Sequence, residues 1–170
     1  TLDRDLQYKS EQLLGDSLGA IIALNPVNGE IYAAVSKPDY EPFFMSSHFT
    51  QEEYNILLND PKSPLYNRVT QSKYPPGSSY KLVGAIAALN ENIISQDQTF
   101  VCNGSFRIGR KTHYCWRKAG HGKLNLLQAI EQSCNVYFYN ISQKLTLEQW
   151  AYYGNLFQFG KNTGIDFPEE

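Results

Sequence analysis

The sequence predicts one α+β domain, and three observations lead to that prediction. Two short apolar runs joined by a glycine-containing turn are typical of a β-hairpin over residues 18–35. Further along, apolar residues recur at helical spacing in several segments, so helices follow the strands in chain order. With 170 residues, of which 42% are hydrophobic and 19% charged, the chain can bury a core, and this composition excludes intrinsic disorder.

Charge and hydropathy argue against two classes of function. Lys and Arg total 15 against 17 Asp and Glu, and the net charge of −2 gives no reason to expect a nucleic-acid binder or a polybasic membrane clamp. No apolar run approaches the roughly 18 residues that a membrane helix needs. The chain begins at Thr1 and ends on Pro168-Glu169-Glu170, and we expect it to be part of a longer protein.

The first half of the chain carries the clearest strand patterns. The runs Leu18–Leu24 and Glu30–Val35 predict two strands, with Asn25–Gly29 as the turn between them. Residues 36–74 are polar and interrupted by prolines, which favours a loop-rich region with one short helix at Gln51–Asn59. Two clear strand patterns are few for a sheet.

Residues 75–170 are predicted to be mostly helical. After a Pro-Pro-Gly start signal, the apolar spacing predicts a buried helix over Ser78–Asn90. Alternating and glycine-containing pieces in Phe100–Trp116 predict short strands. The remaining helices are predicted over Leu124–Lys144, in two parts that meet around Ser133, and over Leu147–Phe157.

Ser78 and Lys81 form a Ser-x-x-Lys motif at the start of the predicted helix, and their spacing places both on one helix face. A serine becomes a nucleophile when a base accepts its proton, and a partly desolvated lysine one turn away can do so. The helix N-terminus can also stabilise a developing oxyanion. The alternative is a helix-capping serine followed by a solvated lysine, because such a tetrad is expected about once in a chain of this length.

A second motif, Ser133-Cys134-Asn135, lies at the predicted break between two helices, where a hydroxyl and an amide can face a cleft. Alone it means little. Ser-x-x-Lys, a Ser-x-Asn relative and Lys-Thr-Gly are the set used by penicillin-binding proteins and class A β-lactamases. Two of the three occur here, once each and in order, which favours an acyl-transfer site.

Further segments join the two motifs in one ordered pattern: Thr1-Leu2-Asp3 with Leu6-Gln7, Gly19–Val35, Ser36–Tyr40, Asn67-Arg68, Tyr74–Lys81, Gly120–Asn125, and Phe159-Gly160 with Thr163–Pro168. With this pattern the chain resembles the class B penicillin-binding proteins, which are peptidoglycan D,D-transpeptidases, and among them penicillin-binding protein 2 of the cell-elongation machinery. The resemblance implies an α+β serine transpeptidase fold of the penicillin-binding protein and β-lactamase type. Residues 1–170 would be the N-terminal part of that domain, truncated before the later strands of its sheet.

The resemblance also implies a role for each motif residue. Ser78 would be the nucleophile acylated by the penultimate D-Ala of a peptidoglycan stem peptide, and Lys81 would be its base. Ser133 would relay a proton to the leaving amine, and Asn135 would hold the substrate amide. An amine of a neighbouring stem peptide would then resolve the acyl-enzyme into a cross-link. β-Lactam antibiotics would acylate Ser78 as substrate mimics.

The same resemblance implies a cellular location and partners. It implies a membrane anchor N-terminal to this chain, a periplasmic location at the inner membrane, and elongation-complex partners that include a rod-shape glycosyltransferase. In one respect the sequence departs from the family pattern. No Lys-Ser-Gly or Lys-Thr-Gly triplet occurs, since Lys161-Asn162-Thr163-Gly164 belongs to another family segment. We expect the third motif beyond Glu170. Acylation by residues 1–170 alone is therefore expected to be slow or absent, because an oxyanion-hole amide would come from that motif.

The three cysteines, Cys102, Cys115 and Cys134, fall within 33 residues, and His121 lies among them. Cysteine and histidine are the ligands that zinc prefers, but this spacing is not that of a zinc finger. A Cys102–Cys115 disulfide with Cys134 as a buried thiol explains the residues equally well. His113 is the alternative to His121 as a ligand.

The resemblance favours the metal, because some penicillin-binding protein 2 members hold one beside the active site. Cys102, Cys115, His121 and Cys134 line up with its ligands, with cysteine where relatives can have aspartate. We expect the zinc to be structural, because a closed four-ligand site leaves no open position for substrate. Through Cys134 it would fix Ser133 and Asn135 in place.

Two other functions share the first two motifs. A β-lactam sensor domain would be acylated once and signal, and a serine β-lactamase would lose its penicilloyl adduct rapidly. A lasting adduct favours the transpeptidase or the sensor. His48 is assigned no role.

Overall fold

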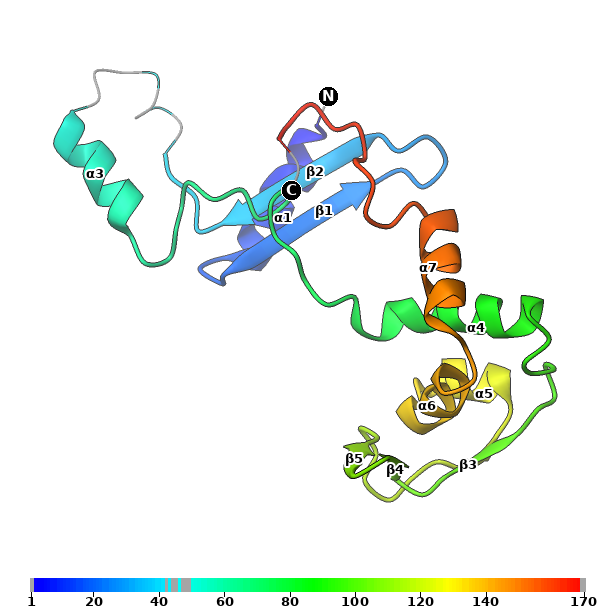
Figure 1. The fold of residues 1–170 in the computed structure, drawn as a ribbon. Coiled ribbons are helices and arrows are strands. Elements are labelled where there is room, and N and C mark those ends of the chain that lie inside the picture. Colours follow the sequence, from blue (N-terminus) through cyan, green and yellow to red (C-terminus); the bar gives the residue numbers. More distant parts are fainter. Residues whose placement is uncertain (1, 42, 44–45, 47–49, 169–170) are drawn as a thin grey trace. The chain divides into compact units, whose positions relative to one another are not determined.

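The computed structural model describes residues 2–41, 43, 46 and 50–168, so His48 lies outside the described residues (Figure 1). The chain divides into two compact units, one formed by Thr1–Tyr74 with Asn162–Glu170 and the other by Pro75–Lys161. Among the described residues, no helix is both long and apolar enough to cross a membrane.

The first unit is built on the predicted hairpin, which is confirmed. Strand β1 (Gly19–Leu24) pairs antiparallel with β2 (Ile31–Lys37), with Ile21 opposite Val35 and a register shift between Ala23 and Leu24. Before it lies helix α1 (Arg4–Leu14), which the sequence analysis missed. The signals for α1 are its caps: Asp3 accepts a hydrogen bond from the backbone N–H of Leu6, and Gly15 ends the helix with a φ of 52°.

Helix α1 covers the outer edge of β2. The Gln7 side chain donates to the carbonyl of Ala34 at 3.2 Å and accepts from its N–H at 2.8 Å. The backbone N–H of Asp3 donates to the carbonyl of Tyr32 at 2.8 Å. These bonds satisfy strand groups that would otherwise be free to pair with another chain.

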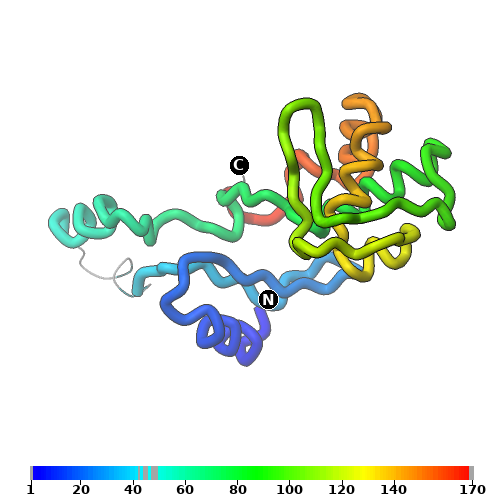
Figure 2. Tube along the Cα trace, turned by 90° about the horizontal axis from the view of Figure 1, so that it is seen from below, coloured from blue at the N-terminus to red at the C-terminus, as the bar shows by residue number. Residues whose placement is uncertain are grey.

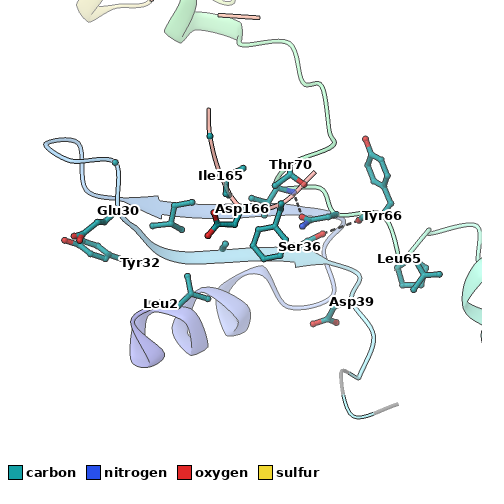
Figure 3. A pocket seen from close by; sticks show the side chains of 18 of the residues that line it. Leu2, Glu30, Tyr32, Ser36, Asp39, Leu65, Tyr66, Thr70, Ile165 and Asp166 are labelled. Carbon is teal, nitrogen blue, oxygen red and sulfur yellow. Dashed lines mark hydrogen bonds between the residues drawn. The ribbon is translucent and has the colours of Figure 1, made fainter. Parts of the chain in front are cut away.

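The rest of the first unit is loop-rich, as predicted. It includes the predicted helix α3 (Gln51–Asn59), which starts with a capping box between Thr50 and Glu53. Segments 64–70 and 164–167 lie against β2 and enclose a pocket of about 850 Å³. Figure 3 shows side chains from all three segments around it. None of the four predicted catalytic residues lines this pocket.

The second unit begins with the helix that carries Ser78 and Lys81. It starts as a 3-10 turn, η1 (Gly77–Tyr80), and continues as α4 (Lys81–Asn90). The prediction of a buried helix is wrong for one face, because Leu82 is 51% and Ile86 39% exposed. The buried face is built instead from small residues, namely Val83, Gly84, Ala85, Ala87 and Ala88.

Four short strands follow in the second unit. β3 (Phe100–Cys102) pairs with β6 (Gly122–Leu124), and β4 (Ser105–Ile108) pairs with β5 (Lys111–Tyr114), all antiparallel. The described residues therefore hold three two-stranded sheets, where the sequence showed only two clear strands. Figure 2 shows the β4–β5 hairpin projecting from the unit. Strands β3, β4 and β5 confirm the short strands predicted in Phe100–Trp116, whereas β6, with three residues, was not predicted.

Three helices complete the second unit: α5 (Leu126–Glu131), α6 (Asn135–Ser142) and α7 (Leu147–Leu156). The predicted break around Ser133 is confirmed. Helix α6 is central, since Val136, Tyr137 and Ile141 are among the most deeply buried side chains. This core holds the start of α6, and the Ser133-Cys134-Asn135 motif with it, at a fixed position.

Candidate active site and metal centre

Ser133 sits in the tight turn between α5 and α6. Its φ of 49° is in the left-handed region, which a serine rarely adopts. The backbone N–H of Ser133 donates to the carbonyl of Ile130, and that of Cys134 donates to Ala129. Asn135 is the first residue of α6. The turn therefore presents two polar side chains on either side of a buried cysteine.

The structure brings the four predicted catalytic residues together. The Lys81 ammonium lies 2.8 Å from the carbonyl oxygen and 3.0 Å from the Oγ of Ser133, and 2.7 Å from Oδ1 of Asn135. The Oγ of Ser133 donates to the Oγ of Ser78 at 2.9 Å. The sequence analysis expected Lys81 to act on Ser78 directly. In the structure the hydrogen bonds lead from Lys81 to Ser78 through Ser133.

Burial lowers the pKa of Lys81 below its ordinary value, because a partly desolvated ammonium loses hydration. The nearby Cys115 and Cys134 act in the opposite direction, since thiolates favour the charged amine. The net effect is a larger fraction of neutral amine at neutral pH than an exposed lysine would have. That neutral form is the one that can accept a proton.

The four predicted metal ligands also converge. One ligand atom from each of Cys102, Cys115, His121 and Cys134 lies within 4.8 Å of all the others. The Nδ1 of His121 is 3.5 Å from the sulfur of Cys102 and 3.5 Å from that of Cys115. All three cysteines are buried, and none is in a disulfide. His113 is not in the cluster, and its ring packs 5.5 Å from that of Tyr139.

The chemistry of the cluster fits a zinc ion. In a tetrahedral site, bond lengths of about 2.0–2.3 Å place neighbouring N and S ligands about 3.5–3.8 Å apart, which matches the two distances from His121. Burial lowers the pKa of His121, which keeps the imidazole in the neutral form that ligates metals. Burial also raises the pKa of Cys134 to about 12, so the thiolate there needs a cation beside it.

The backbone around Cys115 suits a thiolate. Burial opposes the charged form, but hydrogen bonds from the backbone groups of Arg117, Asn135 and Val136 outweigh it and lower the pKa of Cys115. Two of these residues lie in the first turn of α6. The cysteine–histidine cluster and the Ser133-Cys134-Asn135 motif therefore share both Cys134 and backbone contacts.

Gly120 allows the segment that carries His121 to approach Cys102 closely. Its φ is +79°, and a Cβ there would lie 2.1 Å from the carbonyl oxygen of Cys102. That carbonyl accepts a hydrogen bond from the N–H of His121 at 3.0 Å. The close approach of the two segments places His121 beside the sulfur atoms.

Replacing Gly120 by alanine should therefore destabilise the protein and weaken metal binding. Gly122→Ala is the matched control, because Gly122 also has a positive φ of +73° but nothing within 4 Å of an added Cβ. The control should cost about 1–2 kcal/mol of unfolding free energy from backbone strain, and Gly120→Ala at least about 2 kcal/mol more. Denaturant unfolding of both variants measures this, and equal losses would contradict the close approach.

Two exposed aromatic residues beside the site were not singled out from the sequence. Tyr114 and Trp116 flank Cys115 and are 69% and 64% exposed. Asn135 Nδ2 donates to the carbonyl of Tyr114 at 3.4 Å, and the Trp116 indole donates to the carbonyl of Gln132 at 3.0 Å. Side-chain alternation could have indicated their position, because the two neighbours of a buried cysteine in an extended chain face outward.

The comparison with protein families decides where this chain belongs. The family described as the penicillin binding protein transpeptidase domain matches residues 19–170. The chain is a member of this penicillin-binding protein family. The family and fold implied by the resemblance are therefore confirmed.

Members of the family similar to this chain include peptidoglycan D,D-transpeptidase MrdA of Escherichia coli K12, which is 36% identical over 172 residues. The match covers 100% of this chain and 27% of MrdA. Stage V sporulation protein D of Bacillus subtilis is 32% identical, with 99% of this chain and 24% of that protein covered. The chain thus spans about a quarter of the length of the curated relatives it matches.

Solved penicillin-binding proteins have the same fold. Penicillin-binding protein PBP2 from Helicobacter pylori matches with a TM-score of 0.93 and 32% identity, over 100% of this chain and 32% of that one. PBP2 of Pseudomonas aeruginosa, solved in complex with WCK 5153, matches with a TM-score of 0.85 and 31% identity, over 94% and 35%.

Proposed function

We propose that this chain carries the acylation centre of a peptidoglycan D,D-transpeptidase. The observation that carries the proposal is the continuous set of hydrogen bonds from Ser78 through Ser133 to Lys81 and Asn135. Family membership and the printed names of the relatives support the same reaction. The substrates are peptidoglycan stem peptides, and β-lactam antibiotics act as mimics of them.

In the first half of the reaction, Ser78 Oγ attacks the carbonyl carbon of the penultimate D-Ala. Its proton passes to Ser133 Oγ while the proton of Ser133 passes to the neutral Lys81 amine, so one proton moves along two hydrogen bonds. The tetrahedral intermediate then collapses. The terminal D-Ala leaves as an amine that takes a proton back along the same path, and an ester to Ser78 remains.

In the second half, the amine of a neighbouring stem peptide attacks that ester. Ser133 and Lys81 remove its proton and return one to Ser78 Oγ as the new amide bond forms. Asn135 holds the substrate: its Oδ1 is occupied by Lys81, which leaves Nδ2 to donate to a substrate carbonyl. The weak 3.4 Å bond from Nδ2 to the Tyr114 carbonyl is readily exchanged for a substrate.

Cys102, Cys115, His121 and Cys134 would hold a structural zinc ion. Its contribution is to stabilise the fold and neutralise the buried thiolates, with no part in the bond-making steps. Because Cys134 lies between Ser133 and Asn135, the ion would fix the orientation of both side chains. The ligand spacing and the neutral imidazole support this assignment.

Lys81 variants test the proton path. Lys81→Gln and Lys81→Arg should each lower the rate of penicillin acylation by about 10²–10⁴-fold, because arginine keeps the charge but cannot serve as a base. In the unsubstituted protein the rate should rise with pH as Lys81 loses its proton, with its midpoint below the ordinary lysine pKa of 10.5. Stopped-flow acylation measures both. Full activity of Lys81→Arg would exclude Lys81 as the base.

We also propose partners and a cellular location for the whole protein. The structure of the Helicobacter pylori relative in a complex with MreC, and a further match to a peptidoglycan synthase complex, support partners in a cell-elongation assembly. Such partners would include a rod-shape glycosyltransferase. The enzyme would face the periplasm, anchored by a membrane helix outside residues 1–170.

Adduct lifetime separates this function from the sensor and β-lactamase alternatives. The full-length protein should form a penicilloyl adduct that outlasts the minutes of a labelling experiment, followed by intact mass. Rapid return of the unmodified mass would instead identify a β-lactamase. A lasting adduct without any cross-linking of stem peptides would identify a sensor.

A further inference from the structure

The segment between the two active-site motifs has an unusual charge. Between Asp97 and Glu131 the chain has no acidic residue, although it has 17 elsewhere. The same segment has six cationic residues, all exposed: Arg107, Arg110, Lys111, Arg117, Lys118 and Lys123. We call these six residues the cationic surface.

These charges lack acidic partners in the described part of the chain. The salt bridges found there are Arg4–Asp5 and Lys37–Asp39, both in the first unit. Arg107 donates only to the carbonyl of Gly109, at 3.1 Å. Like charges gathered on one small unit repel one another, so their clustering has a cost that a bound anion would remove.

The β4–β5 hairpin connects this surface to the active site. Phe106 and His113 form a cross-strand pair that faces Tyr139, at ring distances of 6.1 and 5.5 Å. Because side chains alternate across a strand, the next pairs on either side, which contain Tyr114 and Arg107, face away from the core together.

Tyr114 accepts a hydrogen bond from Asn135 through its carbonyl, so this outward face begins beside the site. It extends along β5 for two residues, or about 7 Å, to Thr112 and its partner Arg107, next to the turn that carries Arg110. A ligand that leaves the acylation centre along this face would meet cations within the length of one peptide.

We propose that the cationic surface is an exosite that binds the carboxylates of the peptidoglycan strand whose stem peptide occupies the active site. The proposal rests on the proposed function, since it names where the remainder of that substrate lies. Stem peptides carry free carboxylates at intervals along the glycan, and exposed arginine and lysine side chains pair with such groups. The binding should weaken with salt, because exposed charge pairs are screened.

The test is strand binding by the full-length protein with Ser78→Ala, which binds without reacting. The surface variant is Arg107→Gln/Arg110→Gln/Lys111→Gln, and the charge-matched control is Lys9→Gln/Lys62→Gln/Lys161→Gln, whose residues are exposed and outside the cationic surface. The ligands are fluorescent uncross-linked glycan strands with free stem carboxylates, and the same strands with those carboxylates amidated. Anisotropy gives Kd for each pair.

The surface variant should bind free-carboxylate strands about tenfold more weakly than the control, the size expected for three lost exposed charge contacts. Amidation should weaken binding to the control by at least this factor and should weaken binding to the surface variant by less, because part of the contacts that amidation removes is already lost in that variant. The proposal would be overturned if the surface variant lost as much affinity for amidated strands as for free-carboxylate strands. It would also be overturned if the variant lost affinity for neither kind of strand. A surface variant that binds phosphatidylglycerol vesicles more weakly but binds strands with unchanged affinity would also overturn the proposal, because the six residues would then be a membrane contact.

Penicillin labelling with Ser78 intact separates this proposal from the proposed function. The surface variant should be acylated at the same rate as the control, since a small β-lactam at Ser78 does not reach the substituted residues at the far end of the hairpin. A protein that binds strands in this carboxylate-dependent way but is never acylated would support the exosite and contradict the transpeptidase. An acylated protein whose surface variant binds strands normally would overturn the exosite alone.

Discussion

Replacing Ser78 by alanine should abolish the covalent penicillin adduct of the full-length protein. The reason is chemical, because the proposed adduct is an ester to Ser78 Oγ, and alanine has no hydroxyl to form it. Ser79→Ala is the matched control, since Ser79 is adjacent and exposed but donates to the carbonyl of Pro76 rather than toward Ser133. The control should keep its acylation rate within a few-fold.

Gel fluorescence with a labelled penicillin and peptide mapping of the adduct measure this prediction. A labelled Ser78→Ala variant would place the nucleophile elsewhere and contradict the assigned site. A loss of labelling in Ser79→Ala that equals the loss in Ser78→Ala would indicate damage to the 3-10 turn η1 rather than removal of the nucleophile.

Loss of the metal should have the second largest effect, this time on stability. Native mass spectrometry of the full-length protein should find one zinc ion bound by this domain, which His121→Gln and Cys115→Ser should remove. Because structural zinc sites contribute several kcal/mol or more to folding, the melting temperature should fall by about 10 °C or more. Chelation should also slow acylation, although Ser78 itself is untouched.

His113→Gln is the control for this prediction, because His113 packs against Tyr139 outside the cluster. It should keep the zinc and most of the stability. A denatured mass lighter by about two hydrogens, with no metal, would mean a disulfide between two of the cysteines. Unchanged acylation and melting temperature after removal of a bound metal would contradict the role of the ion in fixing Ser133 and Asn135.

The elements predicted from sequence were those with a strong local pattern. The hairpin β1–β2 has two apolar runs around a glycine turn, and the break at Ser133 interrupts a clear helical spacing. Helix α1 was not predicted because its stability does not come from apolar residues at regular helical spacing. It depends on the Asp3 cap and on Gln7 reaching the backbone of Ala34, which lies 27 residues away in the chain.

The structure brings together the residues that the sequence named, but the hydrogen bonds between them could not be predicted. The sequence named Ser78, Lys81 and Ser133, but their order along the hydrogen bonds depends on side-chain positions set by two helices. The choice between His121 and His113 as a ligand was likewise not decided by spacing. The geometry favours His121, because the pairing of β3 with β6 brings His121 beside Cys102, while His113 faces Tyr139.

Cross-linking of stem peptides is the most direct test of the central claim, that this chain provides the acylation centre of a transpeptidase. The full-length protein is incubated with uncross-linked peptidoglycan strands that end in D-Ala-D-Ala, and muropeptides and free D-Ala are quantified. The account predicts cross-linked dimers and about one D-Ala released per cross-link, both absent in Ser78→Ala. Unchanged strands, with a protein that forms only a stable penicilloyl adduct, would contradict it.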